Sequence, residues 1–324
     1  MKRYPLKLTY IAKSAIWGGK KLMNDWGKES ADDIIAETWE LSVRRNEMAR
    51  VTNGEASGMT LAEYIDACGA DCVSPEHSTD KPFPLLIKFI DAADHLSVQV
   101  HPDDEYAASV ESDVGKTEMW YIVDAEPGAH IVCGLAEGVG RDELAAAVSE
   151  GRTGEAMRYI PVSAGESYFI PAGMIHAIGA GILIAEIQQN SDLTYRVYDY
   201  DRVGADGKKR ELHVKKALDV TRPWDDGERD AVAFVRGREC ADGELLANSR
   251  YFSVVKRTVR EEKEYNVGKE SFEHILCVGG EGYIVFEGET YPISRGDSYY
   301  LPANMGEYKL GSREGKLEVI CSKV

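Results

Sequence analysis

Two potential metal ligands lie two residues apart in the stretch LSVQVHPDDEY, residues 96–106. Apolar and polar residues alternate there until Pro102, which is typical of a β-strand with one apolar and one polar face. The polar face carries Gln99 and His101, whose amide oxygen and imidazole nitrogen can both coordinate a divalent cation. The strand pattern leaves open whether this face meets solvent or a site.

Glu118 and His176 could complete a metal site with this strand. Glu118 begins the next expected strand, in GKTEMWY, on the same face as Lys116, and His176 follows the PAG turn. If the strands close into a β-barrel, inward positions alternate on every strand and the four candidate ligands can converge. Two imidazoles, a carboxylate and an amide oxygen suit zinc, with iron, manganese and cobalt as competitors. From spacing alone, a hydrogen-bonded histidine in the core or on the surface remains the alternative.

An internal repeat predicts that the strands belong to two β domains of one design. VSAGESYFIPAGMIH (162–176) matches ISRGDSYYLPANMGE (293–307) at seven of fifteen positions. Upstream, WYIVDAEPGAHIVCG (120–134) resembles HILCVGGEGYIVFEG (274–288) at a larger offset, 154 residues against 131. The difference predicts a helical insertion in the first copy, at about 135–158.

The second copy lacks the candidate ligands. In the repeat, His176 falls on Glu307 and Glu118 falls on Phe272, and nothing like VQVH precedes the second copy. We therefore expect a catalytic, metal-binding domain at residues 1–230 and a related domain without metal ligands at 231–324.

Most of the remaining chain consists of short β-like segments separated by glycine turns, which predicts a mainly β fold of sandwiches or barrels. Helices are expected at only a few places, one of them with Thr60 and Glu63 as a capping box. These expected helices span residues 30–37, 60–68, 141–151 and 215–221.

Composition limits the partners. The chain has 324 residues and a formal net charge of −17. A polyanion would be repelled, so nucleic acid is not expected, and an anionic small substrate would need a local cluster of Lys and Arg. No apolar run reaches the roughly 18–20 residues of a membrane span, and MKRYPLKLTY has no signal core. With six scattered cysteines, we expect reduced thiols and a cytoplasmic protein that binds no membrane.

Several long motifs resemble one family, the type I phosphomannose isomerases in their short bacterial form. They are KFIDAADHLSVQVHPDD, GKTEMWYIV, IPAGMIHAI and AEIQQNSDLTYRVYDYDR, with IWGG and TWELS nearer the N-terminus. The resemblance covers residues 5–225 in order and is looser beyond. His95 stands where the family commonly has lysine, and the family's longer helical domain is reduced to the insertion at 135–158.

The resemblance implies a bicupin fold, with two jelly-roll β-barrels, and a zinc-dependent aldose–ketose isomerase. The implied reaction interconverts mannose 6-phosphate and fructose 6-phosphate through an enediol, with one Zn²⁺ per chain and other divalent metals as alternatives. Transferred onto this chain, the metal ligands would be the four residues already identified from alternation, Gln99, His101, Glu118 and His176.

The resemblance also implies catalytic and substrate-binding residues. Arg196 matches the family's active-site arginine, and Lys88, Lys116 and Glu186 match residues around the substrate. Either Glu186 or a lysine whose pKa is lowered by the metal could be the general base. Three alternatives stay open: a non-catalytic sugar-binding bicupin, an isomerase of another sugar phosphate, and a cupin dioxygenase, which the Gln-plus-Glu ligand set disfavours. The sequence gives no expectation for the oligomeric state.

Overall fold

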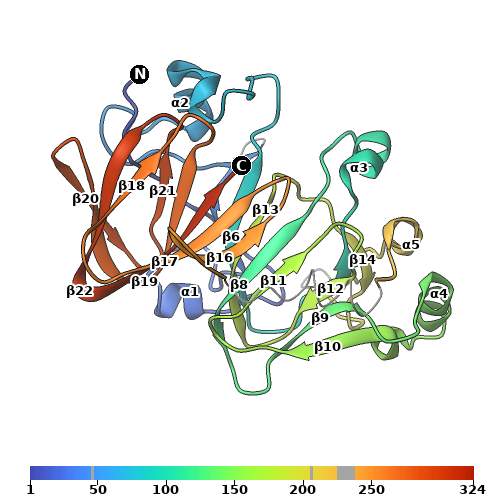
Figure 1. The fold of residues 1–324 in the computed structure, drawn as a ribbon. Coiled ribbons are helices and arrows are strands. Elements are labelled where there is room, and N and C mark those ends of the chain that lie inside the picture. The colour runs from blue at the N-terminus through green and yellow to red at the C-terminus, as the bar shows by residue number, and fades with distance from the viewer. Residues whose placement is uncertain (45–46, 205–206, 225–237) are drawn as a thin grey trace.

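Two groups of strands lie side by side in the computed structural model, which describes residues 1–44, 47–204, 207–224 and 238–324 (Figure 1). We call the six-stranded and five-stranded sheets together the first β unit, and the nine-stranded sheet the second β unit. The expected mainly β architecture is confirmed.

The first β unit consists of two sheets. The six-stranded sheet has the order β11 (Ser167–Ile170), β8 (Glu118–Ala125), β13 (Ile182–Gln189), β6 (Leu85–Ala92), β3 (Glu37–Leu41) and β2 (Ile11–Lys13). The five-stranded sheet has the order β10 (Met157–Pro161), β9 (His130–Leu135), β12 (His176–Ile178), β7 (Val98–Val100) and β14 (Tyr195–Tyr198). A small hairpin, β4 (Val43–Arg44) and β5 (Glu47–Met48), stands apart from both.

The second β unit combines strands from both ends of the chain. Its main path is β1 (Leu6–Lys7), β21 (Ser298–Leu301), β19 (Glu273–Phe286), β22 (Gly306–Lys323), β17 (Ser253–Val259), β16 (Gly243–Asn248) and β15 (Arg238–Cys240). β18 (Lys263–Val267) pairs with β22, and β20 (Glu289–Ser294) pairs with β19. Because β1 pairs with β21, the N-terminal strand belongs by its hydrogen bonds to the second unit. The predicted boundary between residues 230 and 231 lies outside the described residues.

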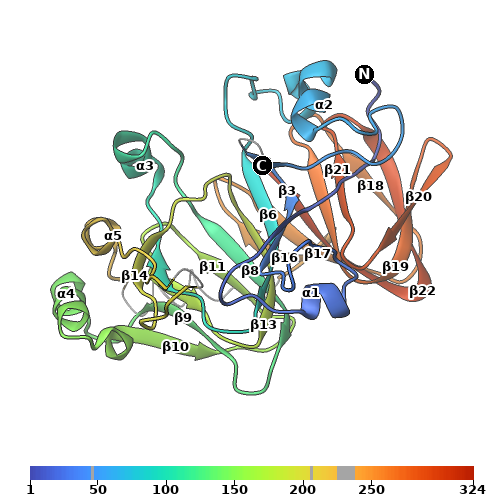
Figure 2. The ribbon, with the colours of Figure 1, turned by 180° about the vertical axis from the view of Figure 1, so that it is seen from behind.

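The six-stranded sheet is buried on both faces because it stands between the five-stranded sheet and the second β unit (Figure 2). Every residue of β6 and of β13 is buried. Along β6, Leu85, Ile87 and Phe89 pack into a core shared with the second unit, whereas Ile90 and Ala92 pack inside the first. Burial on both faces explains the nearly continuous apolar run LLIKFI in this strand.

Helices are short and lie at the periphery. They are α1 (Lys21–Asn24), α2 (Leu61–Cys68), η1 (Ala70–Cys72), α3 (Asp104–Val110), α4 (Arg141–Ser149), η2 (Thr153–Ala156) and α5 (Val214–Val220). The predicted capping box of α2 is present, with Glu63 N donating to Thr60 Oγ1 and Thr60 N donating to Glu63. α4 and η2 both lie within the predicted insertion. None of the described helices is long and apolar enough to cross a bilayer.

The helix expected at residues 30–37 is wrong. The backbone there bonds to neighbouring segments instead, with Ile35 N donating to Gly19 O and Ala36 N donating to Lys13 O, and it continues into β3 at Glu37. Tertiary pairing has overridden a weak local preference. Conversely, α3 was not expected. Asp103 caps it by accepting from Tyr106 N at 3.0 Å, a cap that the DDEY sequence contains.

Candidate active site

Three of the four predicted metal ligands converge inside the first β unit. His101 follows β7, Glu118 begins β8 and His176 begins β12. The Nε2 atoms of the two histidines are 3.1 Å apart, and each lies 3.4 Å from a different carboxylate oxygen of Glu118. All three side chains are at most 1% exposed. They form the sole cluster of this kind within the part of the chain that the structure describes.

The unsatisfied lone pairs of this cluster fit a metal ion. His176 Nδ1 lies 2.8 Å from the carbonyl oxygen of Met174, which can only accept, so this nitrogen carries the proton and Nε2 presents its lone pair. Neither buried oxygen of Glu118 accepts a hydrogen bond of normal geometry, although Lys116 Nζ lies 3.0 Å from Oε2. A cation at the centre would satisfy these groups together.

The electrostatics favour the protonation states that coordinate metals. Burial, followed by the charge of Lys116, lowers the pKa of His101 to about 3, and burial also lowers the pKa of His176. Burial alone would raise the pKa of Glu118, but Lys116 and the two histidines hold it well below its usual value. The imidazoles are therefore neutral and the carboxylate ionised at neutral pH.

Gln99 lies beside this cluster on β7. Its Cα pairs with that of His176 on one side and with that of Arg196 on the other. Gln99 also lines the adjoining cavity. The register therefore places Gln99 on β7 next to His176, with His101 directly after the strand, and coordination by the Gln99 amide stays a prediction.

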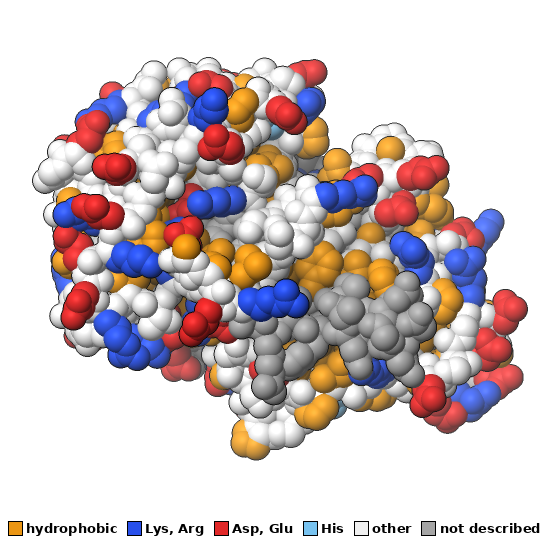
Figure 3. Space-filling model, in the orientation of Figure 1, with side chains coloured by type: hydrophobic (Ala, Val, Ile, Leu, Met, Phe, Trp, Pro, Cys, Tyr) orange, Lys and Arg blue, Asp and Glu red, His pale blue; other side chains and the backbone are white. Residues whose placement is uncertain are grey.

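A cavity of about 180 Å³ opens beside the cluster and brings together the other predicted site residues. It is lined by Trp17, Glu37, Trp39, Lys88, Ile90, Leu96, Ser97, Gln99, Lys116, Ile178, Glu186, Asp192, Thr194, Arg196 and Arg210. A wider groove of about 990 Å³ runs between α1 and β19 but contains none of the predicted site residues. Volume alone therefore does not identify the site. Acidic and basic side chains are interspersed on the face shown in Figure 3, and no large area of one charge stands out there.

The floor of the cavity carries a buried cation between two carboxylates. Lys88 Nζ lies 3.2 Å from Glu37 Oε2 and 3.4 Å from Glu186 Oε2. Burial would lower the pKa of Lys88, but the two carboxylates raise it overall. Burial, followed by the charge of Glu118, raises the pKa of Glu186, whereas Lys88 lowers that of Glu37 despite its burial. Two carboxyl groups with opposite shifts are suited to different steps of acid–base catalysis.

Family models match both parts of the chain. Residues 6–129 match the phosphomannose isomerase type I catalytic domain, and residues 243–324 match the mannose-6-phosphate isomerase cupin domain. Mannose-6-phosphate isomerase ManA of Bacillus subtilis is 38% identical over 98% of each chain. The chain belongs to the type I phosphomannose isomerase family. A second family member, the mannose-6-phosphate isomerase of Streptococcus mutans, is 35% identical over 98% of each chain.

Solved structures of phosphomannose isomerases have the same fold. The crystal structure of the Bacillus subtilis mannose 6-phosphate isomerase superposes with a TM-score of 0.89 at 34% identity and covers 99% of both chains. A Salmonella typhimurium phosphomannose isomerase variant, at 15% identity and a TM-score of 0.78, shares the fold. The predicted bicupin fold class and the family resemblance are thereby confirmed.

Sequence reasoning missed several residues of this phosphomannose isomerase cavity, among them Glu37 and Arg210. Glu37 directly precedes the TWELS motif and alternates with Trp39, a pattern that could have placed both on one face of a strand. Arg210 had no such pattern. Its Nε donates to Asp199 Oδ2 at 2.7 Å, and Asp199 also binds Arg202 at 2.7 Å. Arg210 reaches the cavity from a loop, where neither periodicity nor spacing constrains a side chain.

Arg196 lies where the family resemblance predicted, at the cavity wall. Its Nε donates to Ser97 Oγ at 3.2 Å and its NH1 to the Glu211 carbonyl at 2.9 Å. Burial and the nearby charge of Arg210 lower its pKa, although the guanidinium stays charged. Two guanidinium groups on one wall suit an anionic substituent of the substrate.

The acidic stretch that follows β7 supports the site through hydrogen bonds. Asp104 Oδ1 accepts from Gln189 Nε2 at 2.9 Å, and Gln189 Oε1 in turn accepts from Thr117 N at 2.9 Å. Thr117 lies between Lys116 and Glu118. Asp104 therefore supports the strand end that carries both residues.

The structure also shifts the match between the two copies by one residue. β8 pairs Glu118 with Ile170, and β19 pairs Glu273 with Leu301. Since Ile170 and Leu301 occupy the same place in the repeat, Glu273 is the counterpart of Glu118, and the sequence match to Phe272 is wrong.

The second ligand position is shifted in the same way. Glu307, which the repeat matches to His176, is exposed, and it is the next residue, Tyr308, whose hydroxyl donates to Glu273. Arg257 binds both the carboxylate of Glu273, at 2.7 and 3.1 Å, and the Tyr308 hydroxyl, at 2.6 Å. The second unit has thus kept a buried carboxylate but surrounds it with a guanidinium and a phenol.

Proposed function

We propose that this protein is a metal-dependent aldose–ketose isomerase that interconverts mannose 6-phosphate and fructose 6-phosphate through an enediol. One observation carries the proposal. A buried His–Glu–His cluster with free lone pairs adjoins a cavity in which three carboxyl groups, two lysines and two arginines converge. The relatives named for this activity match this chain over nearly their whole length.

Gln99, His101, Glu118 and His176 would hold one divalent ion, Zn²⁺ by preference for this ligand set. When bound, the ion would supply positive charge to the oxygens that become negative in the enediolate. The protein's own residues must then move one proton between C2 and C1 and hold the open-chain sugar phosphate in place.

Glu186 is the residue we propose to carry that proton. Its Oε1 accepts from Trp120 Nε1 at 3.1 Å, whereas its buried Oε2 has no hydrogen bond among the described residues and has only Lys88 3.4 Å away. A carboxyl group with a raised pKa can take a proton from one carbon and return it to the next. Lys88 is a poor alternative, since its two carboxylate neighbours raise its pKa.

Lys116 and the two arginines have separate roles in this proposal. Lys116 Nζ, 3.0 Å from Glu118 Oε2 and lining the cavity, would donate to the oxygen that becomes an anion. Arg196 and Arg210 would bind the phosphate, because a guanidinium can bind it bidentately. Lys88 is already neutralised by Glu37 and Glu186, so it would contact the sugar rather than the phosphate. Catalysis on a cytoplasmic metabolite is consistent with free thiols in all six cysteines.

The test is an assay coupled to mannose 6-phosphate conversion, with elemental analysis of the same preparation. We expect about one zinc per chain, loss of turnover after chelation and recovery when zinc is restored. Full turnover by metal-free protein would refute the metal dependence. Turnover of other sugar phosphates, with none of mannose 6-phosphate, would refute the substrate, and metal binding without any turnover would favour a sugar-binding protein.

A further inference from the structure

β3 lies between the cavity of the first β unit and the second β unit. One of its faces lines the cavity, and the other packs against the second unit. Glu37 and Trp39 line the cavity. Between Trp39, which pairs with Lys88, and Leu41, which pairs with Ile87, the register shifts by one residue. Glu40 is therefore the extra residue of a β-bulge, a feature that redirects side chains and often lies next to active sites.

The side chain of Glu40 ends in a buried ion pair behind the strand. Lys28 Nζ donates to Glu40 Oε1 at 2.6 Å and to the carbonyl oxygen of Gly296 at 2.8 Å. The two side chains are 5% and 1% exposed, and the ammonium lies 4.1 Å from the ring centre of Tyr10. Gly296 belongs to the turn between β20 and β21. One buried cation thus holds the bulge of β3 against a turn of the second unit.

The backbone of Glu40 is held by the second unit as well. Ser298 Oγ donates to the Glu40 carbonyl oxygen at 2.8 Å, and His274 Nε2 lies 2.7 Å from Ser298 Oγ. Since the hydroxyl donates its own proton to Glu40, it accepts one from His274. Both Ser298 and His274 are buried and lie on strands of the second unit. The side chain of Glu40 is therefore linked through Lys28 to the turn at Gly296. The main chain of Glu40 is bound directly by Ser298 of β21.

On the opposite face, the groups next to Glu40 act in the cavity. Trp39 Nε1 donates to Glu37 Oε2 at 2.7 Å, and the same oxygen lies 3.2 Å from Lys88 Nζ. A shift of the bulge would move Trp39 and Glu37, and through Lys88 the environment of Glu186. Because Trp39 and Glu37 are one and three residues from Glu40, we expect both side chains to move when the contacts of Glu40 are lost.

We propose that Glu40 is a positioning residue, through which the second β unit sets the place of Glu37 and Trp39 in the cavity. This inference rests on the proposed isomerase function. The second unit contains no metal cluster among its described residues. The proposal gives it a part in catalysis nonetheless, as the rigid support of one wall of the site.

The test compares two matched substitutions of buried, ion-paired carboxylates, Glu40→Gln and Glu273→Gln. Each keeps the size of the side chain and leaves a buried cation unpaired, so both should lower stability. Glu40→Gln should also lower kcat about 10- to 100-fold, the scale of a misplaced catalytic group. Its KM should change less than about threefold, because Arg196 and Arg210 lie on other segments. Its metal content should be unchanged, and Glu273→Gln should keep wild-type kcat.

A double variant covers the case in which Glu40→Gln fails to fold. Replacement of both partners by apolar residues, Lys28→Met with Glu40→Leu, removes the unpaired charge and is often tolerated. We expect it to fold and to show the same loss of kcat. Wild-type kcat in folded Glu40→Gln, or in the double variant, would overturn the inference. No turnover by the wild-type protein would instead refute the proposed function.

Discussion

The two β units have the same buried carboxylate at the same register position but surround it with different partners. In the first unit, Glu118 faces His101 and His176 with oxygens that accept no hydrogen bond of normal geometry. In the second, Glu273 is bound by Arg257, by Tyr308 and by Lys323 at 2.9 Å. A guanidinium supplies charge and donors together, so this carboxylate is satisfied by the protein alone.

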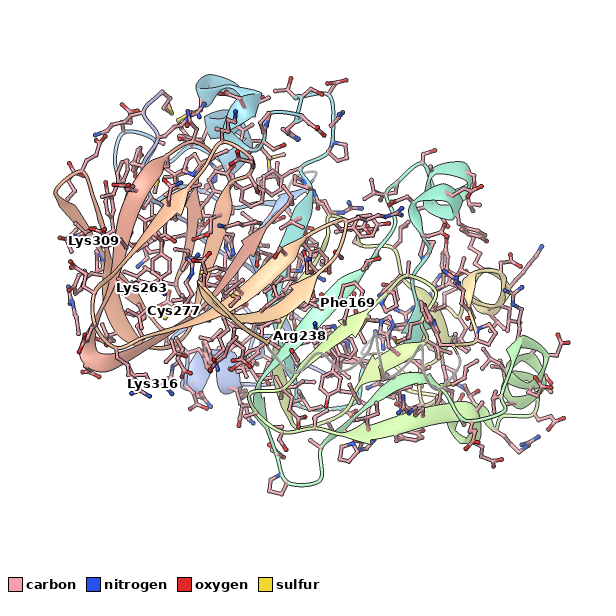
Figure 4. The ribbon with its side chains drawn as sticks, viewed as in Figure 1. Phe169, Arg238, Lys263, Cys277, Lys309 and Lys316 are labelled. Atoms are coloured by element: carbon pink, nitrogen blue, oxygen red, sulfur yellow. The ribbon has the colours of Figure 1, made fainter. Side chains whose placement is uncertain are left out.

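The difference teaches how one design serves two purposes. A site that must bind a metal leaves lone pairs unsatisfied inside the protein, which costs stability until the metal is bound. The second unit does not bind a metal at Glu273 in this proposal, and Arg257 and Tyr308 satisfy its carboxylate with hydrogen bonds. The second unit packs against the first at Phe252, whose ring centre lies 6.1 Å from that of Phe169. Phe169 is labelled in Figure 4.

The largest expected effect comes from removing a ligand in the first unit. His101→Ala should lose the metal and lower kcat/KM by roughly 10³-fold or more, the scale of losing a stabiliser of a developing oxyanion. Coupled assays with metal analysis would measure both. His130→Ala, a half-buried histidine of the same unit outside the cavity, is the matched control. Equal losses in the two variants would contradict the assignment of the metal site.

Breaking the ion pair between Arg257 and Glu273 in the second unit should lower stability and leave activity unchanged. Arg257→Met leaves Glu273 buried without its main partner, and should lower the free energy of unfolding by about 3–5 kcal/mol, with kcat unchanged in the folded protein. Urea unfolding and the same assay would measure the two effects. Arg257→Met combined with Glu273→Met should recover much of the stability. A variant that stays as stable as wild type would show that the guanidinium does not stabilise this carboxylate.

The smallest effect concerns pH and the buried histidine of the second unit. Burial lowers the pKa of His274 from 6.5 to about 3. Between pH 6.5 and about pH 3, His274 is therefore protonated in the unfolded chain and neutral in the folded chain. Stability should therefore fall as the pH falls below about 6.5, by up to about 1.4 kcal/mol per pH unit from this residue. Urea unfolding of metal-loaded protein at pH 7.5 and 5.5 would test this. His274→Gln should show a smaller loss between the two pH values, and an identical loss would contradict the interpretation.

Local patterns predicted the features that depend on neighbouring residues in the chain. Alternation predicted the strand that carries Gln99, which pairs with His176, and the Thr60–Glu63 spacing predicted the cap of α2. The helix expected at residues 30–37 failed because its backbone pairs with segments from elsewhere in the chain. The repeat was recognised, but its register was one residue off at Glu273, because turn residues align well in sequence while strand pairing fixes which side chains face inward.

The sequence by itself determined the type of fold, the family and three of the metal-site residues that lie together, since strand period, repeat and long motifs are local properties. Only the tertiary structure decided that Glu37 and Arg210 belong to the cavity, that Arg257 binds Glu273, and that Glu40 is held by the second unit. The physical reason is that each of these contacts joins residues far apart in the chain. Their distances depend on sheet register, on a β-bulge and on packing between the two units, and no spacing in the sequence encodes those distances.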